Sequence, residues 1–181
     1  MNTPRLASPD IRCLAPDGAT IAALAALLVK TVAAGGSVGF MHPLAPATAQ
    51  AFCRSTLEAA ARGERIVLGA FVDGELVSTV TLHLALPENQ PHRAEIAKMM
   101  TRPDVRGRGL ARALLAEAER LARDHGRTLV VLDTAEQEGA AGLYEAQGFI
   151  RAGAIPDYAL KPRGGLTATL LYFKRLDAED G

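Results

Sequence analysis

The chain has 181 residues, of which 49% are hydrophobic and 22% charged, a composition typical of one globular domain over residues 1–181. Its 20 basic and 20 acidic residues cancel, and only 4% of its residues are aromatic. This balance disfavours nucleic acid and anionic membranes as partners, because such surfaces attract a basic excess and single strands stack on aromatic rings.

Targeting and metal signals are weak along the chain. No stretch approaches the roughly 18 uncharged apolar residues of a membrane span, and the N-terminus lacks a charged start followed by an apolar run. We therefore expect a cytoplasmic protein. The two cysteines are Cys13 and Cys53, and the sequence holds no CxxC motif and no Cys/His cluster at metal-ligand spacing. Both are interpreted as small buried hydrophobic residues, and no metal site is expected.

Hydrophobic periodicity and turn residues predict the element order β-α-α-β-β-β-α-β-α-β-β. The strands are expected at 11–14, 65–72, 75–86, 92–101 and 128–133, from Phe149 onward, and at 166–175. The helices are expected at 18–32, 46–63, 109–125 and 138–147. Asp73-Gly74 predicts a tight hairpin turn. Antiparallel strands early and a strand–helix–strand unit later imply a mixed α/β sheet.

Between the first two predicted helices lies a loop, 37–43, that is unusually apolar for a surface connection. Two interpretations stay open. The loop lines a pocket, or it packs under the first helix. A pocket-lining loop would favour a small ligand over an extended polypeptide.

The segment 105–115 joins a predicted strand to a predicted helix and carries Gly107 and Gly109. Glycines allow a tight turn that points several N–H groups into one concavity, and the helix N-terminus adds partial positive charge. The segment is therefore a candidate pyrophosphate cradle. Three arginines around it could neutralise phosphate charge: Arg106, Arg108 and Arg112.

Other phosphate-binding motifs fit this segment less well. A Walker loop requires Gly-Lys-Ser/Thr, which is missing. A dinucleotide fingerprint requires a third small residue where Arg112 stands, although Asp133 lies near the place of a ribose-binding acid. A nucleotide-binding oxidoreductase remains an alternative, but the glycines follow two helices and several strands instead of opening a βαβ unit.

Two motifs carry a family resemblance. Arg106-x-x-Gly109-x-Ala111 resembles the R/Q-x-x-G-x-G/A signature of GNAT N-acetyltransferases, and residues 141–149 (AGLYEAQGF) resemble the family's A-x-x-L-Y-x-x-x-G-F. They lie at the family's usual separation, with a helix and a strand between. The resemblance implies the α/β GNAT fold: a mixed, mostly antiparallel sheet flanked by helices, whose central parallel strands splay to hold CoA.

The resemblance also implies the activity. Acetyl-CoA would be the co-substrate, and the acetyl group would pass to the amine of a small, cationic or amino-acid-like acceptor in a direct ternary-complex mechanism. A homodimer is left open. A narrower likeness links four segments to the tabtoxin-resistance branch of the family: 37–40, 92–98, 132–134 and 155–159. The rival hypothesis is a GNAT-fold sensor that binds acyl-CoA without turnover.

Family roles carry over to individual positions. Tyr144 matches the tyrosine that protonates the departing CoA thiolate, a thiol of pKa about 8.5 to which a phenol is a competent donor; the alternative is a packed core tyrosine. Backbone groups of three residues match those that pair with the pantetheine arm and polarise the acetyl carbonyl: Met99, Met100 and Thr101. Residues implied in CoA contact are Arg106, Gly107, Arg108, Gly109, Leu110, Ala111 and Arg112, together with Gln137 near the place of a family asparagine.

Two carboxylates are candidates for the base or for binding a cationic substrate. Glu95 lies early in the strand before the signature, and Asp133 ends the strand after it. Splayed strands would place both beside the cleft, and Asp157, expected in the loop before the last strand, could join them. The alternatives are a helix cap or ion pair for Asp133, and a pair with Arg93 or Lys98 for Glu95.

Overall fold

The computed structural model describes residues 9–136 and 140–176, and the order of its elements is the predicted one. The strands are β1 (Asp10–Cys13), β2 (Arg65–Val72), β3 (Glu75–His83), β4 (Arg93–Thr101), β5 (Leu129–Ala135), β6 (Ile150–Leu160) and β7 (Leu166–Arg175). The helices are α1 (Gly18–Ala33), α2 (Pro46–Ala61), the 3-10 turn η1 (Pro103–Val105), α3 (Leu110–Asp124) and α4 (Ala141–Ala146).

The largest differences from prediction concern three elements. β3 ends at His83, three residues earlier than expected, and part of the expected α4 falls on 138–139, outside the described residues. Asp157 lies within the span of β6 and not in a loop. Pro156 suggested a break there, but β6 is an edge strand whose register is irregular between Ile155 and Ala159. Proline is tolerated at such an edge irregularity because no ladder donor is required of it.

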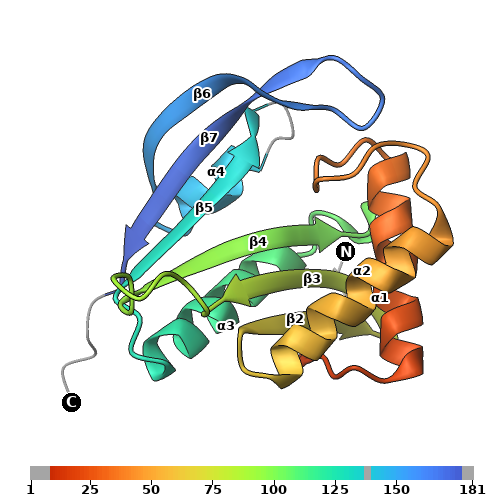
Figure 1. The fold of residues 1–181 in the computed structure, drawn as a ribbon, viewed down its shortest axis with the longest axis horizontal. Coiled ribbons are helices and arrows are strands. Elements are labelled where there is room, and N and C mark those ends of the chain that lie inside the picture. The colour runs from red at the N-terminus through yellow and green to blue at the C-terminus, as the bar shows by residue number, and fades with distance from the viewer. Residues whose placement is uncertain (1–8, 137–139, 177–181) are drawn as a thin grey trace, which may run out of the picture.

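One seven-stranded sheet, ordered β1-β2-β3-β4-β5-β7-β6, runs through the molecule. All neighbouring pairs are antiparallel except β4 and β5. Helices α1 and α2 cover one face, and α3 lies behind the other (Figure 1). The two faces bury separate hydrophobic clusters, one with α3 and α4 and one with α1 and α2. The predicted mixed, mostly antiparallel sheet flanked by helices is confirmed.

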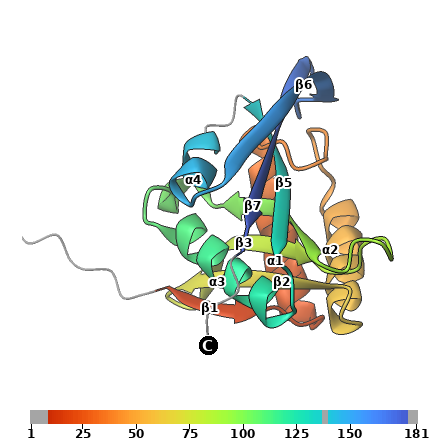
Figure 2. The same ribbon diagram turned by 90° about the vertical axis from the view of Figure 1, so that its left-hand side faces the viewer.

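The two parallel strands separate midway along their length. Pairing between β4 and β5 ends at Ile96 and Leu132, although the strands continue to Thr101 and Ala135. Figure 1 shows them diverging from a common end, and Figure 2 shows β5 standing away from the β2–β4 layer. The predicted splay is therefore present. Beyond it, the backbone groups on the facing edges of β4 and β5 no longer pair with one another.

A β-bulge lies in β4 at the start of the splay. Thr81 pairs with Ala97 but Thr79 pairs with Met100, so two residues of β4 stand opposite Val80. Lys98, one of the two, has a φ of 53°. Ala94 and Ile96 pack toward α3, whereas Met100 packs toward α1 and α2. The bulge thus shifts the alternation of side chains between the two faces.

Two connections distant in sequence meet above the splayed end of the sheet. The N–H of His42, in the α1–α2 loop, donates to the carbonyl of Pro162 in the β6–β7 turn at 2.8 Å. Arg163 donates to the carbonyl of Ala33 at 2.7 Å. Figure 1 shows the β6–β7 hairpin extending to the loop at the end of α1. These bonds join the α1–α2 loop, 34–45, to the end of the β6–β7 hairpin, 158–165, over the gap between β4 and β5. These two segments are called the roof.

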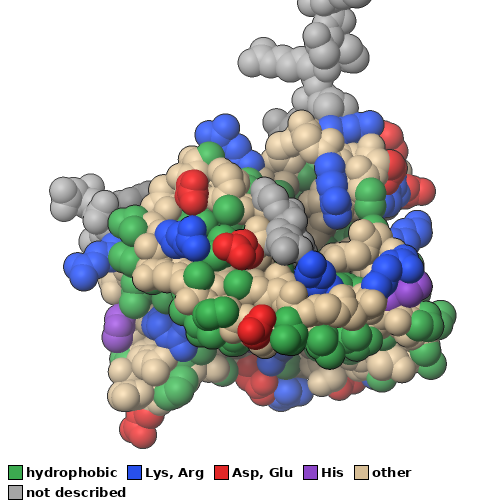
Figure 3. Space-filling model, turned by 90° about the horizontal axis from the view of Figure 1, so that it is seen from above, with side chains coloured by type: hydrophobic (Ala, Val, Ile, Leu, Met, Phe, Trp, Pro, Cys, Tyr) green, Lys and Arg blue, Asp and Glu red, His purple; other side chains and the backbone are tan. Residues whose placement is uncertain are grey.

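The outer strands expose several apolar side chains. Figure 3 views the molecule from the side of β6 and β7, where hydrophobic side chains reach the surface. The large ones on this hairpin are Ile150, Ile155, Tyr158, Leu160 and Leu166.

The two cysteines differ in exposure. Cys13, expected to be buried, is exposed on the edge strand β1. Cys53 is buried, and burial raises the pKa of its thiol to about 11. Within the described ranges, no helix is long and apolar enough to cross a membrane.

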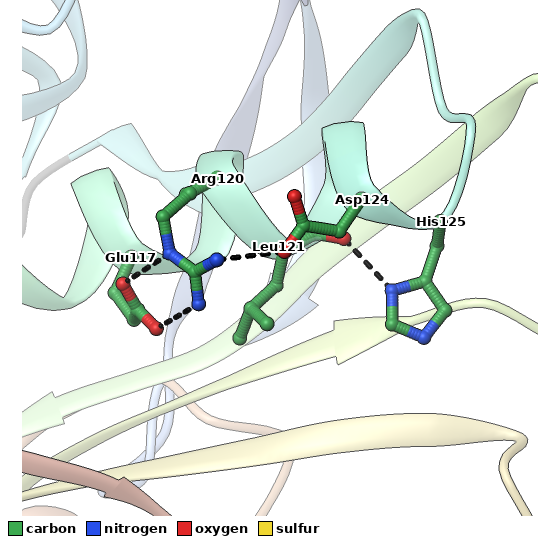
Figure 4. Close-up of polar contacts among 5 residues, drawn as sticks. All are labelled: Glu117, Arg120, Leu121, Asp124 and His125. Atoms are coloured by element: carbon green, nitrogen blue, oxygen red, sulfur yellow. Dashed lines mark hydrogen bonds and ion pairs between the residues drawn. The ribbon is translucent and has the colours of Figure 1, made fainter.

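An ion pair between a buried carboxylate and a partly exposed lysine joins α3 to β7. Glu119 is only 5% exposed, and its Oε2 lies 2.7 Å from Lys174 Nζ. Lys174 also donates to the carbonyl of Gln147, the C-cap of α4, at 2.6 Å. The outer face of α3 carries an exposed network instead: Arg120 bridges Glu117 and Asp124, and His125 Nδ1 lies 2.8 Å from the Leu121 carbonyl (Figure 4).

We expect Lys174→Met to destabilise the protein by about 2 kcal/mol, because it removes the nearer cation of the buried Glu119 carboxylate and leaves only Arg123, at 3.8 Å. Arg120→Met is the control on the same helix, since exposed ion pairs contribute little. Urea unfolding at neutral pH measures both. A Lys174→Met midpoint as close to wild type as that of the control would show that the pair does not hold α3 to β7.

Candidate active site

The predicted phosphate cradle forms where β4 passes through η1 into α3. Gly107 and Gly109 have φ values of 75° and 79°, which only glycine adopts readily. Gly109 is the N-cap of α3 and contributes no side-chain cap, so the N–H groups of the first turn are directed outward. Such a left-handed turn before a helix is an anion-binding concavity.

A cavity of about 640 Å³ opens over this cradle. Most of the predicted CoA contacts line it: Met99, Thr101, Arg106, Gly107, Gly109, Leu110, Ala111 and Arg112. Arg108 is exposed and is not among its lining residues. Met100 is buried against α1 and α2, and its carbonyl accepts a bond from Ser78 Oγ at 2.8 Å. Gln137 lies outside the described residues.

A second cavity, of about 260 Å³, passes through the gap between β4 and β5. Met99 and Ala140 line both cavities, so the two are adjoining parts of one cleft. The roof contributes Val38 and Tyr158. Of the two interpretations of the apolar loop, both apply. Residues 37–39 line the cleft, while Phe40 packs against the hydrophobic cluster that α1 and α2 share, with its ring edge-on to Phe52 of α2 at a centroid distance of 5.0 Å.

Tyr144 reaches the cleft from α4. The side chain is only 4% exposed, yet it lines the smaller cavity. Its ring packs against Phe149 and Tyr172 at centroid distances of 5.9 and 6.0 Å. Tyr144, the predicted proton donor, therefore lies both in the core and at the cleft.

The two candidate acids occupy different positions. Asp133 directly follows the last β4–β5 pair, lines the smaller cavity, and accepts a bond from Thr169 Oγ1 at 3.0 Å. Glu95 lies opposite Val131, where the strands are still paired, and forms an ion pair with Arg93 at 3.1 Å. Glu95 is not among the residues lining the cleft. The splay thus brings Asp133, but not Glu95, to the same cavity as Tyr144.

Sequence reasoning assigned no site role to Lys98, which the bulge places in this cavity. Its Nζ donates to the carbonyl of Val38 at 2.7 Å and lies 5.9 Å from the centroid of the Phe52 ring. Burial lowers the pKa of Lys98, and the nearby Asp133 carboxylate opposes that shift. A lysine in the middle of an otherwise apolar strand segment, 96–100, was the available signal.

Comparison with known proteins identifies the family. Residues 37–149, more than half of the chain, match the model of the acetyltransferase (GNAT) family. The chain belongs to the GNAT family. Members of this family are acetyltransferases that use acetyl-CoA as co-substrate, and this membership disfavours the oxidoreductase alternative. The matched region includes the cradle, both splayed strands and α4.

Individual relatives of this GNAT protein agree with that assignment. Human N-acetyltransferase 8B is 38% identical over 74 residues, which cover 38% of this chain and 33% of the relative. A ribosomal-protein-alanine N-acetyltransferase from Brucella melitensis superposes with a TM-score of 0.77 at 23% identity, covering 92% of this chain and 99% of that one. An acetyltransferase from Salmonella typhimurium, solved with its cofactor acetyl-CoA, gives 0.78 at 20% identity, covering 97% and 98%. The two structures bear on the fold alone.

Proposed function

We propose that this GNAT protein transfers the acetyl group of acetyl-CoA directly to the amine of a small, cationic or amino-acid-like acceptor. The observation that carries the proposal is the single cleft that crosses the sheet through the β4–β5 gap. It joins the glycine cradle on the α3 face to a small cavity holding Tyr144, Asp133 and Lys98. Donor and acceptor would enter from opposite faces and meet in the gap.

The donor side would hold CoA through the backbone of β4 and the cradle. N–H groups of 107–111 would bind the pyrophosphate, with the side chains of Arg106 and Arg112 adding positive charge at the cavity wall. Beyond Ile96, the β4 edge has lost β5 as a partner and offers its backbone to the pantetheine arm. Met99 and Thr101 line that path, and for Met100 only a backbone role is proposed.

In the proposed reaction, the acceptor's neutral nitrogen attacks the thioester carbon. The new C–N bond forms as the C–S bond breaks, and the nitrogen loses a proton to Asp133, directly or through water. The departing thiolate takes a proton from Tyr144, which solvent later restores. Glu95 could serve only at a distance, through a water relay, because Arg93 holds its carboxylate outside the cleft lining.

The dimensions of the acceptor side favour a small molecule. The cavity measures about 260 Å³, near the lower end of ordinary ligand pockets. Residues 37–39 and 158–160 line one side of it, and the His42–Pro162 bond ties the two segments that carry them together. An extended basic peptide would need an open groove. Membership of the tabtoxin-resistance branch, a single working domain over 1–181 and a homodimer remain hypotheses.

A thiol-release assay with acetyl-CoA tests this function. The panel contains small amines, amino acids and short basic peptides at equal concentrations. We expect turnover with small amines and much slower release with peptides. Acetyl-CoA binding without thiol release for any acceptor would favour the sensor hypothesis, and a peptide as the best acceptor would contradict the proposed size of the site.

Asp133→Asn removes the charge of the proposed base or binder while keeping the side chain's shape. We expect kcat/KM for the best acceptor to fall by about 10²-fold or more, with unchanged acetyl-CoA affinity. Glu95→Gln is the matched control, since its carboxylate lies outside the cleft lining. Steady-state kinetics would contradict the assignment if Glu95→Gln lost more activity than Asp133→Asn.

A further inference from the structure

The smaller cavity carries one charge of each sign. Among the described residues that line it, Lys98 is the one Lys or Arg and Asp133 the one Asp or Glu. They belong to the two strands that separate there. They lie close enough for the charge of the Asp133 carboxylate to raise the pKa of Lys98, against the effect of burial. The cavity is therefore electrically mixed, where the sequence had suggested an acidic opening.

The position of Lys98 demands an explanation, because it is unfavourable in two ways. Its backbone adopts a φ of 53°, a conformation that side-chain-bearing residues rarely occupy. Its ammonium is partly removed from water, which costs free energy unless the charge is paired with an opposite charge and hydrogen-bonded. Strain and buried charge of this kind gather at functional sites.

The hydrogen bond from Lys98 to the loop 37–39 uses only part of the hydrogen-bonding capacity of its ammonium. An ammonium has three N–H donors, and the bond to the Val38 carbonyl uses one of them. Gly39 leaves the adjacent space open, since a Cβ at that position would lie 3.1 Å from Nζ. The bond to Val38 fixes the ammonium at the wall of the cavity, beside the place where an acceptor would lie.

We propose that Lys98 binds a carboxylate of the acceptor, so that the acceptor is an amino acid or a similar zwitterion. The acceptor's amine lies toward Asp133 and its carboxylate toward Lys98. This inference rests on the proposed function and narrows its substrate class. A diamine or polyamine would place a second cation against Lys98 and is disfavoured by like-charge repulsion.

Matched acceptors isolate the carboxylate. Each of several small L-amino acids is compared with its own α-amide, which keeps the side chain and removes the negative charge. The amide's amine is less basic and hence more often neutral, so amine availability favours the amide. For the wild type, we expect kcat/KM to be about 10- to 100-fold higher for the acid, the range of a hydrogen bond to a charged group.

Lys98→Met keeps the length of the side chain and removes its charge. We expect the acid-to-amide ratio of kcat/KM to fall close to 1, and Lys98→Arg to retain some of the preference. Lys30→Met, at an exposed lysine of α1 away from this cavity, should keep the wild-type ratio. Because the readout is a ratio within one variant, a general loss of activity does not imitate the effect. Circular dichroism checks folding, and Lys98→Gln replaces Lys98→Met if the latter is unfolded.

The outcomes separate the two proposals. Acetylation of amines with equal kcat/KM for acids and amides in the wild type would overturn the role of Lys98 and leave the proposed function standing. An unchanged acid preference in folded Lys98→Met or Lys98→Gln would do the same. If no member of either series is acetylated while acetyl-CoA binds, the proposed function fails and this inference fails with it.

Discussion

Replacing Gly109 with valine is expected to reduce acetyl-CoA affinity by more than about 100-fold. A β-branched residue at a φ of 79° is strained, and its side chain would project into the cavity that Gly109 lines, where the pyrophosphate is proposed to bind. Isothermal titration calorimetry with acetyl-CoA measures the loss directly. Arg106→Ala should weaken binding more modestly, because it removes charge but leaves the backbone cradle intact.

Gly126→Val is the matched control for backbone strain. Gly126 also has a positive φ, 68°, but it follows the far end of α3 and lies away from the cradle. Its valine variant should lose stability and keep its acetyl-CoA affinity. Unchanged affinity in a folded Gly109→Val protein would contradict the placement of CoA, whereas a parallel loss in Gly126→Val would trace the effect to strain alone.

Tyr144→Phe is expected to lower kcat by about 10²–10⁴-fold with little change in acetyl-CoA affinity. The substitution removes only the proposed proton donor and keeps the ring that packs against Phe149 and Tyr172. Single-turnover measurements are appropriate, because they report the chemical step even when product release limits kcat.

Tyr172→Phe provides the control for loss of a buried hydroxyl. The Tyr172 hydroxyl donates to Glu145 Oε1 at 2.9 Å, and burial together with that carboxylate raises its pKa. The residue does not line the cleft, so its phenylalanine variant should lose some stability and keep a single-turnover rate within a few-fold of wild type. A wild-type rate in Tyr144→Phe would leave Tyr144 as a packing residue.

Local chemistry made most of the fold predictable. Asp73-Gly74 specified the β2–β3 turn, and both residues have positive φ values, 51° and 80°, as a tight hairpin of this kind requires. The amphipathic stripe of 109–125 and the glycine after it marked α3 to within one residue at each end. The splay of β4 and β5 came from the family resemblance, since no local pattern distinguishes paired from separated strands.

The site was less predictable, because its geometry depends on strand register. Whether Glu95 faces an open gap depends on where β4 and β5 separate, and their last pair, Ile96 with Leu132, lies just beyond Glu95. The β4 bulge shifts the alternation of the strand, so an alternating pattern cannot assign Lys98 to the cavity. The roof likewise depends on the β6–β7 turn meeting a loop that is far from it in the chain.

Transfer of a radiolabelled acetyl group tests the central claim most directly. The protein is incubated with acetyl-CoA labelled in the acetyl carbon and with the best small acceptor from the panel, and the products are separated. We expect the label to appear in an amide of the acceptor, in equal amount to the thiol released, with no labelled protein intermediate. Label that stays on CoA despite binding, or that accumulates on the protein, would contradict direct acetyl transfer across the β4–β5 gap.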